Sequence, residues 1–362
     1  MGKSKRLFLN LRSYAPKTNP TTILNLIFFP GVLSAQQSVK EWFSHPALTA
    51  AAMVSEKYTP QDGSFKTSTI TMLRAGFGTE KDPFKVTLIF DIPTTRFLTL
   101  EAHWQPLPQI GVRVGLQKML FMTETTYAPY MLGMVGFSQA ASYLGGYSND
   151  ITGISSRSRD VGIVLQGSFF PTGHGVPRLS YAFGVFNGNG NNFIDNNRAK
   201  DIHGRLIFSP VKGLRISAGF MSGYYSPVEE RRPDSHHHTD EDLACRHRIT
   251  GGVWYESPEW FFRSENVYGV TDGLRSDGVM AMAGWMFKPR LQLAARVDHF
   301  QRNLSDPLSG STKADLCFTH HLTDDGTIFY SIQYGHTFYS DPNVKGLDAI
   351  ILCLSIAFLR TL

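Results

Sequence analysis

The sequence predicts an all-β chain that crosses a membrane as one antiparallel β-barrel of about 16 strands. Three observations predict it: polarity alternates in short segments, the connections between segments alternate in length, and one face of the segments is apolar. The composition agrees, because 33 Gly and 12% aromatic residues favour strands with many turns. The formal charge of +5 gives no indication of nucleic acid as a partner.

The segments of alternating polarity end at Gly, Pro, Asn or Asp, and no helical period of 3.6 persists over three turns. Each is about ten residues long, which is enough to cross a bilayer when the strand is tilted. The predicted strands cover residues 46–56, 65–76, 83–92, 96–105, 110–117, 160–170, 178–187, 200–209, 213–223, 246–257, 260–270, 277–287, 290–301, 312–322, 327–338 and 348–358.

The connections alternate between short turns and long polar loops along the second half of the chain. The short turns lie at 210–212, 257–259, 288–289 and 324–326, and the long loops at 188–199, 224–245, 302–311 and 339–347. Outer-membrane barrels have short periplasmic turns and long outer loops. If the first strand rises from the periplasm, the longest connection, 118–159, is the third outer loop.

The two faces of the strands differ in polarity. Leu214, Ile216 and Phe220 form an apolar face, and Arg215 and Ser217 lie on the other. A sheet of about 16 strands leaves too few other residues to cover its apolar face with protein, so we expect that face to contact lipid. Aromatic residues near strand ends fit the girdles of such barrels; they include Trp104, Trp254, Trp260 and Trp285.

The N-terminus resembles an export signal. Residues 1–22 carry basic side chains and no acidic ones, an apolar run from Ile23 to Leu33 follows, and small residues precede a predicted cleavage after Ala35. We therefore expect a signal peptide at 1–35, a short periplasmic segment at 36–45 and the barrel at 46–362. The predicted location is the outer membrane of a Gram-negative bacterium. No run of about 18 apolar residues indicates a membrane-spanning helix.

Cations on the inward face are the main candidates for function. The pore-lining candidates are Arg74, Arg113, Arg205, Arg215, Arg248, Arg263 and Arg296 on strands, with Lys118, Arg157 and Arg159 in the third loop. Their inward acidic neighbours are Glu101, Asp201, Glu265 and Asp298. A surplus of cations would concentrate anions in the pore. Alternatively these residues brace the wall, for example through Arg263 with Glu265 and Arg296 with Asp298.

Four stretches resemble a known family in their order and spacing: residues 112–129, 158–170, 181–192 and 195–216. The sequence is similar there to the phosphate-selective porins of the O and P type, particularly the Bacteroidetes-type outer-membrane porins. The resemblance implies a sixteen-stranded barrel, usually a trimer, with its third outer loop folded into the pore. The chain departs from that pattern in the few cations of its third loop and in the four residues that follow Phe358.

These features predict a passive channel for small hydrophilic solutes that leans towards anions, phosphate-like ones included. The expected partners are outer-membrane lipid, those solutes and two further copies in a homotrimer, without nucleic acid. The two alternatives are a plugged barrel that serves as a surface adhesin or scaffold, and an exported soluble β-rich binding protein.

We expect no enzyme, catalytic residue, cofactor or metal site, because no hydrolase, metalloprotease, P-loop or dinucleotide-binding motif occurs in its required context. The run His236–His238 beside acidic residues could hold a metal ion, but a solvated acidic loop is the favoured interpretation. We expect Cys245, Cys317 and Cys353 to be free thiols.

Overall fold

The computed structural model describes residues 47–77, 83–173, 175–191, 197–226, 243–324 and 326–361. The expected signal peptide (1–35), the expected periplasmic segment (36–45) and His236–His238 lie outside these ranges and stay predictions. Within the described ranges, no helix is long and apolar enough to cross a bilayer.

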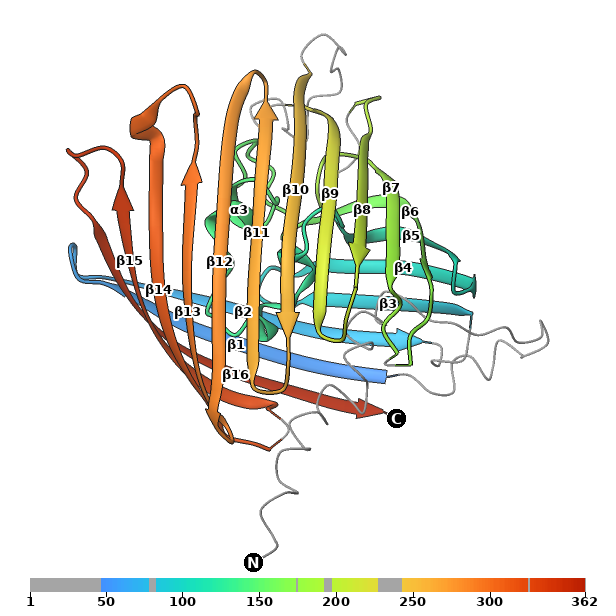
Figure 1. The fold of residues 1–362 in the computed structure, drawn as a ribbon, viewed down its shortest axis with the longest axis horizontal. Helices are drawn as coiled ribbons and strands as arrows, with labels where there is room; N and C mark the ends of the chain where they lie inside the picture. Colours follow the sequence, from blue (N-terminus) through green and yellow to red (C-terminus); the bar gives the residue numbers. More distant parts are fainter. Residues whose placement is uncertain are drawn as a thin grey trace, which may run out of the picture.

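Sixteen antiparallel strands of the described chain close into a barrel, in which β1 pairs with both β2 and β16 (Figure 1). This confirms the predicted fold class, and each predicted segment falls on one observed strand. The strands are β1 (Ala47–Thr59), β2 (Ser64–Phe77), β3 (Phe84–Asp91), β4 (Arg96–Leu107), β5 (Ile110–Lys118), β6 (Arg159–Phe169), β7 (Leu179–Phe186), β8 (Asp201–Phe208), β9 (Leu214–Tyr225), β10 (Ala244–Glu256), β11 (Trp260–Thr271), β12 (Leu274–Lys288), β13 (Leu291–Gln301), β14 (Gly310–His321), β15 (Ile328–Tyr339) and β16 (Leu347–Thr361).

The long connections do not all lie at one end of the barrel, and the short ones do not all lie at the other. The longest, loop L3 (119–158), lies at the same end as the β11–β12 turn, which consists of Asp272 and Gly273 alone. Both residues of that turn have positive φ, at 47° and 80°, as a tight two-residue hairpin requires. At the opposite end, residues 170–178 form a longer connection than the neighbouring turns. The predicted loop 224–245 lies mostly outside the described residues, and which end faces outward stays a prediction.

The exterior of the barrel is apolar. Exposed and buried residues alternate along β10, where Ile249 and Val253 point outward and Arg248 points inward. Leu206 and Val297, on β8 and β13, each keep 54% of their surface exposed. Soluble proteins do not expose contiguous apolar bands of this extent, so the band contacts lipid and the soluble alternative does not fit.

Aromatic rings mark one edge of this band. The rings of Trp260 and Trp285 stack at 5.1 Å between centroids where β11 begins and β12 nears its end. Amphipathic rings settle at headgroup depth, so this pair fits the aromatic girdle that the sequence predicts.

Loop L3 folds into the barrel interior, and it carries the short helices η2 (Glu124–Thr126), η3 (Pro129–Met131) and α3 (Gln139–Tyr143) (Figure 1). Its Leu132 and Leu144 are completely buried and belong to one apolar core with Trp254 and Met280 of the barrel wall. Burial of this apolar surface stabilises the loop in the lumen.

We expected the inward side chains to line a water-filled pore, and this is wrong for much of β9–β16. Arg296 and Asp298 are only 2% and 1% exposed, because L3 covers them. Apolar residues also point inward on these strands and pack against the loop; they include Val267, Met280, Met282 and Phe300. Trp254 is among them, so its expected place in the aromatic girdle is wrong. Strand alternation could not reveal this, because the covering surface comes from a distant part of the chain.

Two glycines let L3 approach the wall closely. A Cβ atom at Gly219 on β9 would collide with the carbonyl oxygen of Phe121. A Cβ atom at Gly278 on β12 would lie 2.8 Å from the Cβ of Ala140 in α3. Side chains at these positions would push the loop away from the strands.

The lipid-facing band predicts that the stability lost by an arginine substitution depends on its depth in the membrane. Val297→Arg, near the middle of β13, should lower the free energy of unfolding by about 2–4 kcal/mol, because an arginine at mid-membrane is poorly solvated. Leu293→Arg, close to the turn on the same strand and face, should cost about 0–1 kcal/mol. Denaturant titration of both variants refolded into lipid vesicles measures the difference, and equal costs would contradict this assignment of the band.

Candidate functional site

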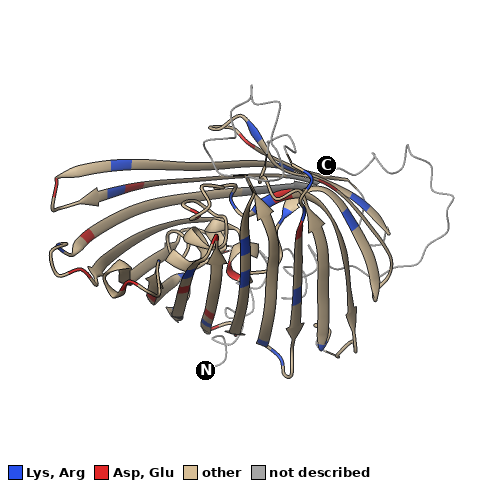
Figure 2. Ribbon diagram, turned by 90° about the horizontal axis from the view of Figure 1, so that it is seen from above, with Lys and Arg blue, Asp and Glu red and all other residues tan. Residues whose placement is uncertain are grey.

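The ten pore-lining candidates lie in two groups, on two sides of L3, and Figure 2 marks Lys and Arg along the strands. The first group borders a cavity between L3 and strands β1–β6: Arg74, Arg113, Lys118, Arg157 and Arg159. The second group comes from β8–β13 and contacts L3 itself: Arg205, Arg215, Arg248, Arg263 and Arg296.

The second group holds the loop in place, and we call its members the anchoring arginines. Arg215 donates a hydrogen bond of 2.7 Å to the Tyr127 hydroxyl. The other four donate to backbone carbonyl oxygens of L3: Arg205 to Met122 (3.3 Å), Arg248 to Leu144, Arg263 to Leu132 (2.7 Å) and Arg296 to Gly136 (2.9 Å). Buried carbonyl groups need such donors, so these contacts satisfy the loop backbone.

Carboxylates neutralise most of the anchoring charge. Arg296 lies 2.8 Å from Asp315 and 3.4 Å from Asp298, so the suggested bracing pair with Asp298 is present. The suggested pair of Arg263 with Glu265 is wrong, because Arg263 contacts Glu256 instead, at 2.8 Å. Four of the five anchoring arginines, all except Arg205, thus form structural ion pairs under the loop within the part of the chain that the structure describes.

Glu265 has a different partner, one that the sequence interpretation missed. Its carboxylate accepts hydrogen bonds from the backbone N–H groups of Thr123 (2.7 Å) and Glu124 (2.8 Å). The Glu124 carboxylate in turn accepts from the backbone N–H of Ser138 at 2.9 Å, and burial raises its pKa. The sequence did contain a signal for this network, because Glu124 is an acidic residue in a loop that was expected inside the lumen.

Asp150 is the other acidic residue of L3 that the sequence interpretation missed. Both of its carboxylate oxygens accept from Arg248, at 2.7 and 2.9 Å. Burial alone would raise the pKa of Asp150, but the Arg248 guanidinium and Thr152 together hold this pKa below its ordinary value. The pair therefore stabilises the fold fully above the ordinary carboxyl pKa of about 3.9, and the contribution is lost as pH falls through the lowered pKa.

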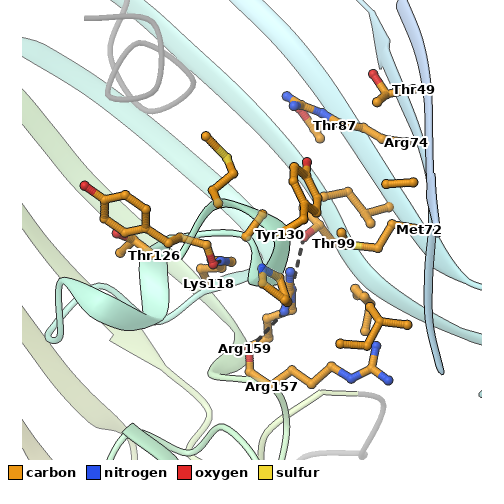
Figure 3. Close-up of a pocket in the computed structure, with 18 of the residues that line it drawn as sticks. Thr49, Met72, Arg74, Thr87, Thr99, Lys118, Thr126, Tyr130, Arg157 and Arg159 are labelled. Atoms are coloured by element: carbon orange, nitrogen blue, oxygen red, sulfur yellow. Dashed lines mark hydrogen bonds between the residues drawn. The ribbon is translucent and has the colours of Figure 1, made fainter. Parts of the chain in front are cut away.

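The cavity between L3 and β1–β6 has a volume of about 190 Å³ (Figure 3). Of the described residues that line it, five are Lys or Arg and one, Glu101, is acidic. A second cavity, of about 310 Å³, lies on another side of η3, and Arg263 is the one Lys or Arg among its described lining residues. Positive charge is therefore concentrated in the first cavity.

Two cations of the first cavity have a carboxylate partner. Arg113 lies 3.5 Å from Glu101, and Arg157 lies 3.2 Å from the buried Asp91 outside the cavity lining. These pairs leave a surplus of positive charge on the wall, because the remaining three cations lack a carboxylate partner within 4 Å in the described residues.

Among the described residues, those three cations contact few groups, and the groups that they contact are neutral. The Lys118 ammonium donates to the carbonyl oxygens of Thr125 and Tyr127, at 2.9 and 2.7 Å. Arg159 donates to the Arg157 carbonyl oxygen at 2.9 Å and weakly to the Thr99 hydroxyl at 3.4 Å, and dashed lines in Figure 3 mark these contacts. Arg74 makes no hydrogen bond or ion pair with any residue that the structure describes. Their charge is available to an anion.

Disrupting the Asp150 pair tests the anchoring role. Arg248→Met should lower the free energy of unfolding by about 3–5 kcal/mol, because it leaves a buried carboxylate without its cation. The double variant Asp150→Asn with Arg248→Met should recover a large part of that loss, since no unpaired charge remains.

Denaturant unfolding of the single and double variants in lipid vesicles measures the coupling between these two residues. Limited proteolysis within L3 supplies an independent readout, and Arg248→Met should be cleaved faster than the parent. Additive costs would mean that Arg248 and Asp150 act separately.

No protein-family model matches this chain, and no curated protein does. Solved structures share its fold. OmpF of Salmonella typhi, solved with daunomycin, has a TM-score of 0.60 at 13% identity and covers 86% of this chain and 97% of its own. The trimer form of OmpT of Vibrio cholerae gives 0.60 at 9% identity, with 87% and 99% covered. The outer membrane channel DcaP of Acinetobacter baumannii gives 0.55 at 10% identity, with 87% and 96% covered. The chain thus has the fold of the porin-like outer-membrane barrels of Gram-negative bacteria.

Proposed function

We propose that this protein is a passive, water-filled channel of the outer membrane for small hydrophilic solutes, and that it prefers anions. One observation carries the proposal: cations outnumber carboxylates five to one on the wall of the cavity beside L3. Charge of one sign in a cleft with low-dielectric walls raises the local concentration of counter-ions. The apolar exterior and the likeness to an outer membrane channel support the setting in the membrane.

The division of the basic residues into two groups supports the anion preference. Four of the five anchoring arginines, all except Arg205, have a described carboxylate within 4 Å, so their field at the passage is largely compensated. Arg74, Lys118 and Arg159 face the cavity with no carboxylate within 4 Å among the described residues. These three cations are the best candidates to attract a passing anion.

Phosphate-like anions are one class of solute that this proposal includes. The family resemblance implies them, although no family model supports membership of the phosphate-selective family. Arg74 and Arg113 on the wall add their guanidinium groups to those of Arg157 and Arg159. A guanidinium binds phosphate and carboxylate oxygens through paired N–H donors, so the cavity has suitable chemistry for either.

We also propose a homotrimer that meets through β1 and β2. The exterior of these strands carries polar groups, since Thr69 lies opposite the outward Val54 and Thr67 donates to the Glu56 carboxylate at 2.6 Å. Polar groups facing lipid are costly, so contact with another copy suits this surface. The trimer form of the similar OmpT barrel supports the same assembly.

Cross-linking tests the trimer. Thr69→Cys should join copies through a short bifunctional thiol reagent. Val253→Cys, on the exterior of β10, should give no more cross-linked product than the parent. The parent, with its three native cysteines, gives the background. Denaturing gel electrophoresis reads the product, and equal cross-linking at both sites would contradict this interface.

Charge neutralisation tests the anion preference. Arg74→Gln with Arg159→Gln should shift the reversal potential in a KCl gradient across a planar bilayer towards cation preference. The shift should shrink at high salt, because the Debye length falls from about 10 Å at 0.1 M to about 3 Å at 1 M. Lys212→Gln with Arg290→Gln, at turns away from the cavity, removes the same charge and is the matched control.

Two outcomes would contradict the proposal. An unchanged reversal potential in the cavity variant would remove the cations as its cause. A folded barrel without conductance would instead favour the plugged scaffold, in which L3 closes the lumen. The expectations of no catalysis, no cofactor and no metal site stay predictions.

A further inference from the structure

We infer that the anions selected by the cavity beside L3 are organic anions with an apolar body, such as aromatic sulfonates and carboxylates, in preference to inorganic anions. The inference rests on the proposed function, because it names the substrate class of the same cavity. The preference for an apolar body depends on the side chains that lie beside the cations of the cavity.

Apolar side chains form much of the cavity wall, beside four threonines. Ile70 and Met72 of β2 and Ile89 of β3 line it from the barrel, and Tyr130 and Met131 of η3 line it from the loop. In Figure 3, Tyr130 and Met72 border the same space as the guanidinium groups of Arg74 and Arg159. A solute in this cavity therefore meets cations and apolar side chains together.

The tyrosines of L3 that line the cavity do not repel an anion. Burial raises the pKa of Tyr130, and burial raises the pKa of Tyr147, which also lines the cavity, to about 12. Both phenols are therefore neutral at pH 7 and present a ring and an O–H donor. The Tyr147 ring packs against Phe137 at 3.8 Å between centroids, which fixes its position.

The apolar part of the wall decides between the two classes of anion. A hydrated inorganic anion gains nothing from methionine and isoleucine, and it loses part of its water beside them. A solute with an anionic head and an apolar body can place its head on the cations and displace water from the apolar wall with its body. The chemistry of the whole wall therefore complements the second kind of solute.

The space is adequate for such a solute. The cavity measures about 190 Å³, whereas a single water molecule needs roughly 10–15 Å³ of such a cavity. An anion with one ring fits this volume without displacing L3 from its anchoring arginines. No movement of the loop is required.

Block of the chloride current tests the inference with a matched pair of probes. Benzenesulfonate and methanesulfonate carry the same permanent charge and differ in the apolar body. In planar bilayers containing the full channel, benzenesulfonate should halve the chloride current at about a tenfold lower concentration, which corresponds to roughly 1.4 kcal/mol. Inorganic phosphate should also block less well than benzenesulfonate.

A substitution assigns the effect to this wall. Met72→Gln keeps the size of the side chain and replaces its apolar end, so it should reduce the ratio of the two half-blocking concentrations by at least threefold. Met286→Gln, an inward methionine on β12 outside both cavities, should leave the ratio at the parental value. The ratio compares two probes in one channel, so changes in total conductance cancel.

The outcomes separate this inference from the proposed function. An anion-selective reversal potential with equal block by the two sulfonates would overturn the inference and leave the proposed function standing. A reversal potential without anion preference would overturn the proposed function itself. A ratio that Met72→Gln does not change would also overturn the inference, because the apolar wall would then not be the cause.

Discussion

The fold depends on the hydrogen bonding of a loop backbone inside a barrel. A buried segment without regular secondary structure has N–H and C=O groups that must find partners, and an unpaired group costs about 1–3 kcal/mol. The wall of this barrel supplies those partners from side chains. Arginines donate to carbonyl groups of L3, and Glu265 accepts from the N–H groups of Thr123 and Glu124.

This requirement divides the interior into two parts with different chemistry. Where the loop lies against β8–β13, charges are paired and apolar side chains form a core, so that region is protein interior. Between the loop and β1–β6 a cavity remains, and few of its cations have carboxylate partners. The same type of residue, an inward arginine, therefore serves structure on one side and is available to solutes on the other.

The sequence was sufficient for the barrel because strand period and lipid contact are local properties. Arg215 between Leu214 and Ile216 shows the two faces of β9 without any knowledge of its neighbours. The roles of the arginines were beyond such reasoning. Arg113 and Arg296 have the same alternation, yet Arg296 donates to the L3 backbone whereas Arg113 lines the cavity.

The partners of single residues were also hidden, for the same reason. Arg263 and Glu265 lie two apart on one face and suggest a pair, yet each contacts a different group. The apolar wall of the cavity was not predictable either, because Met72 and Tyr130 come together through the path of the loop. Alternation identifies the face of a residue, while its neighbour across the lumen depends on tertiary structure.

The contact between Arg296 and Gly136 joins residues far apart in the chain, and it has a consequence for the order of folding. L3 precedes β8–β13 in the chain, so its anchors lie on strands that follow the loop in the sequence. Long-range contacts of this kind form late, because the entropy of closing the intervening chain must be overcome first. Until β13 joins the sheet, the polar groups of the loop have water as their main partner. The final position of the loop is therefore set late in folding, once the strands that carry its anchors have joined the sheet.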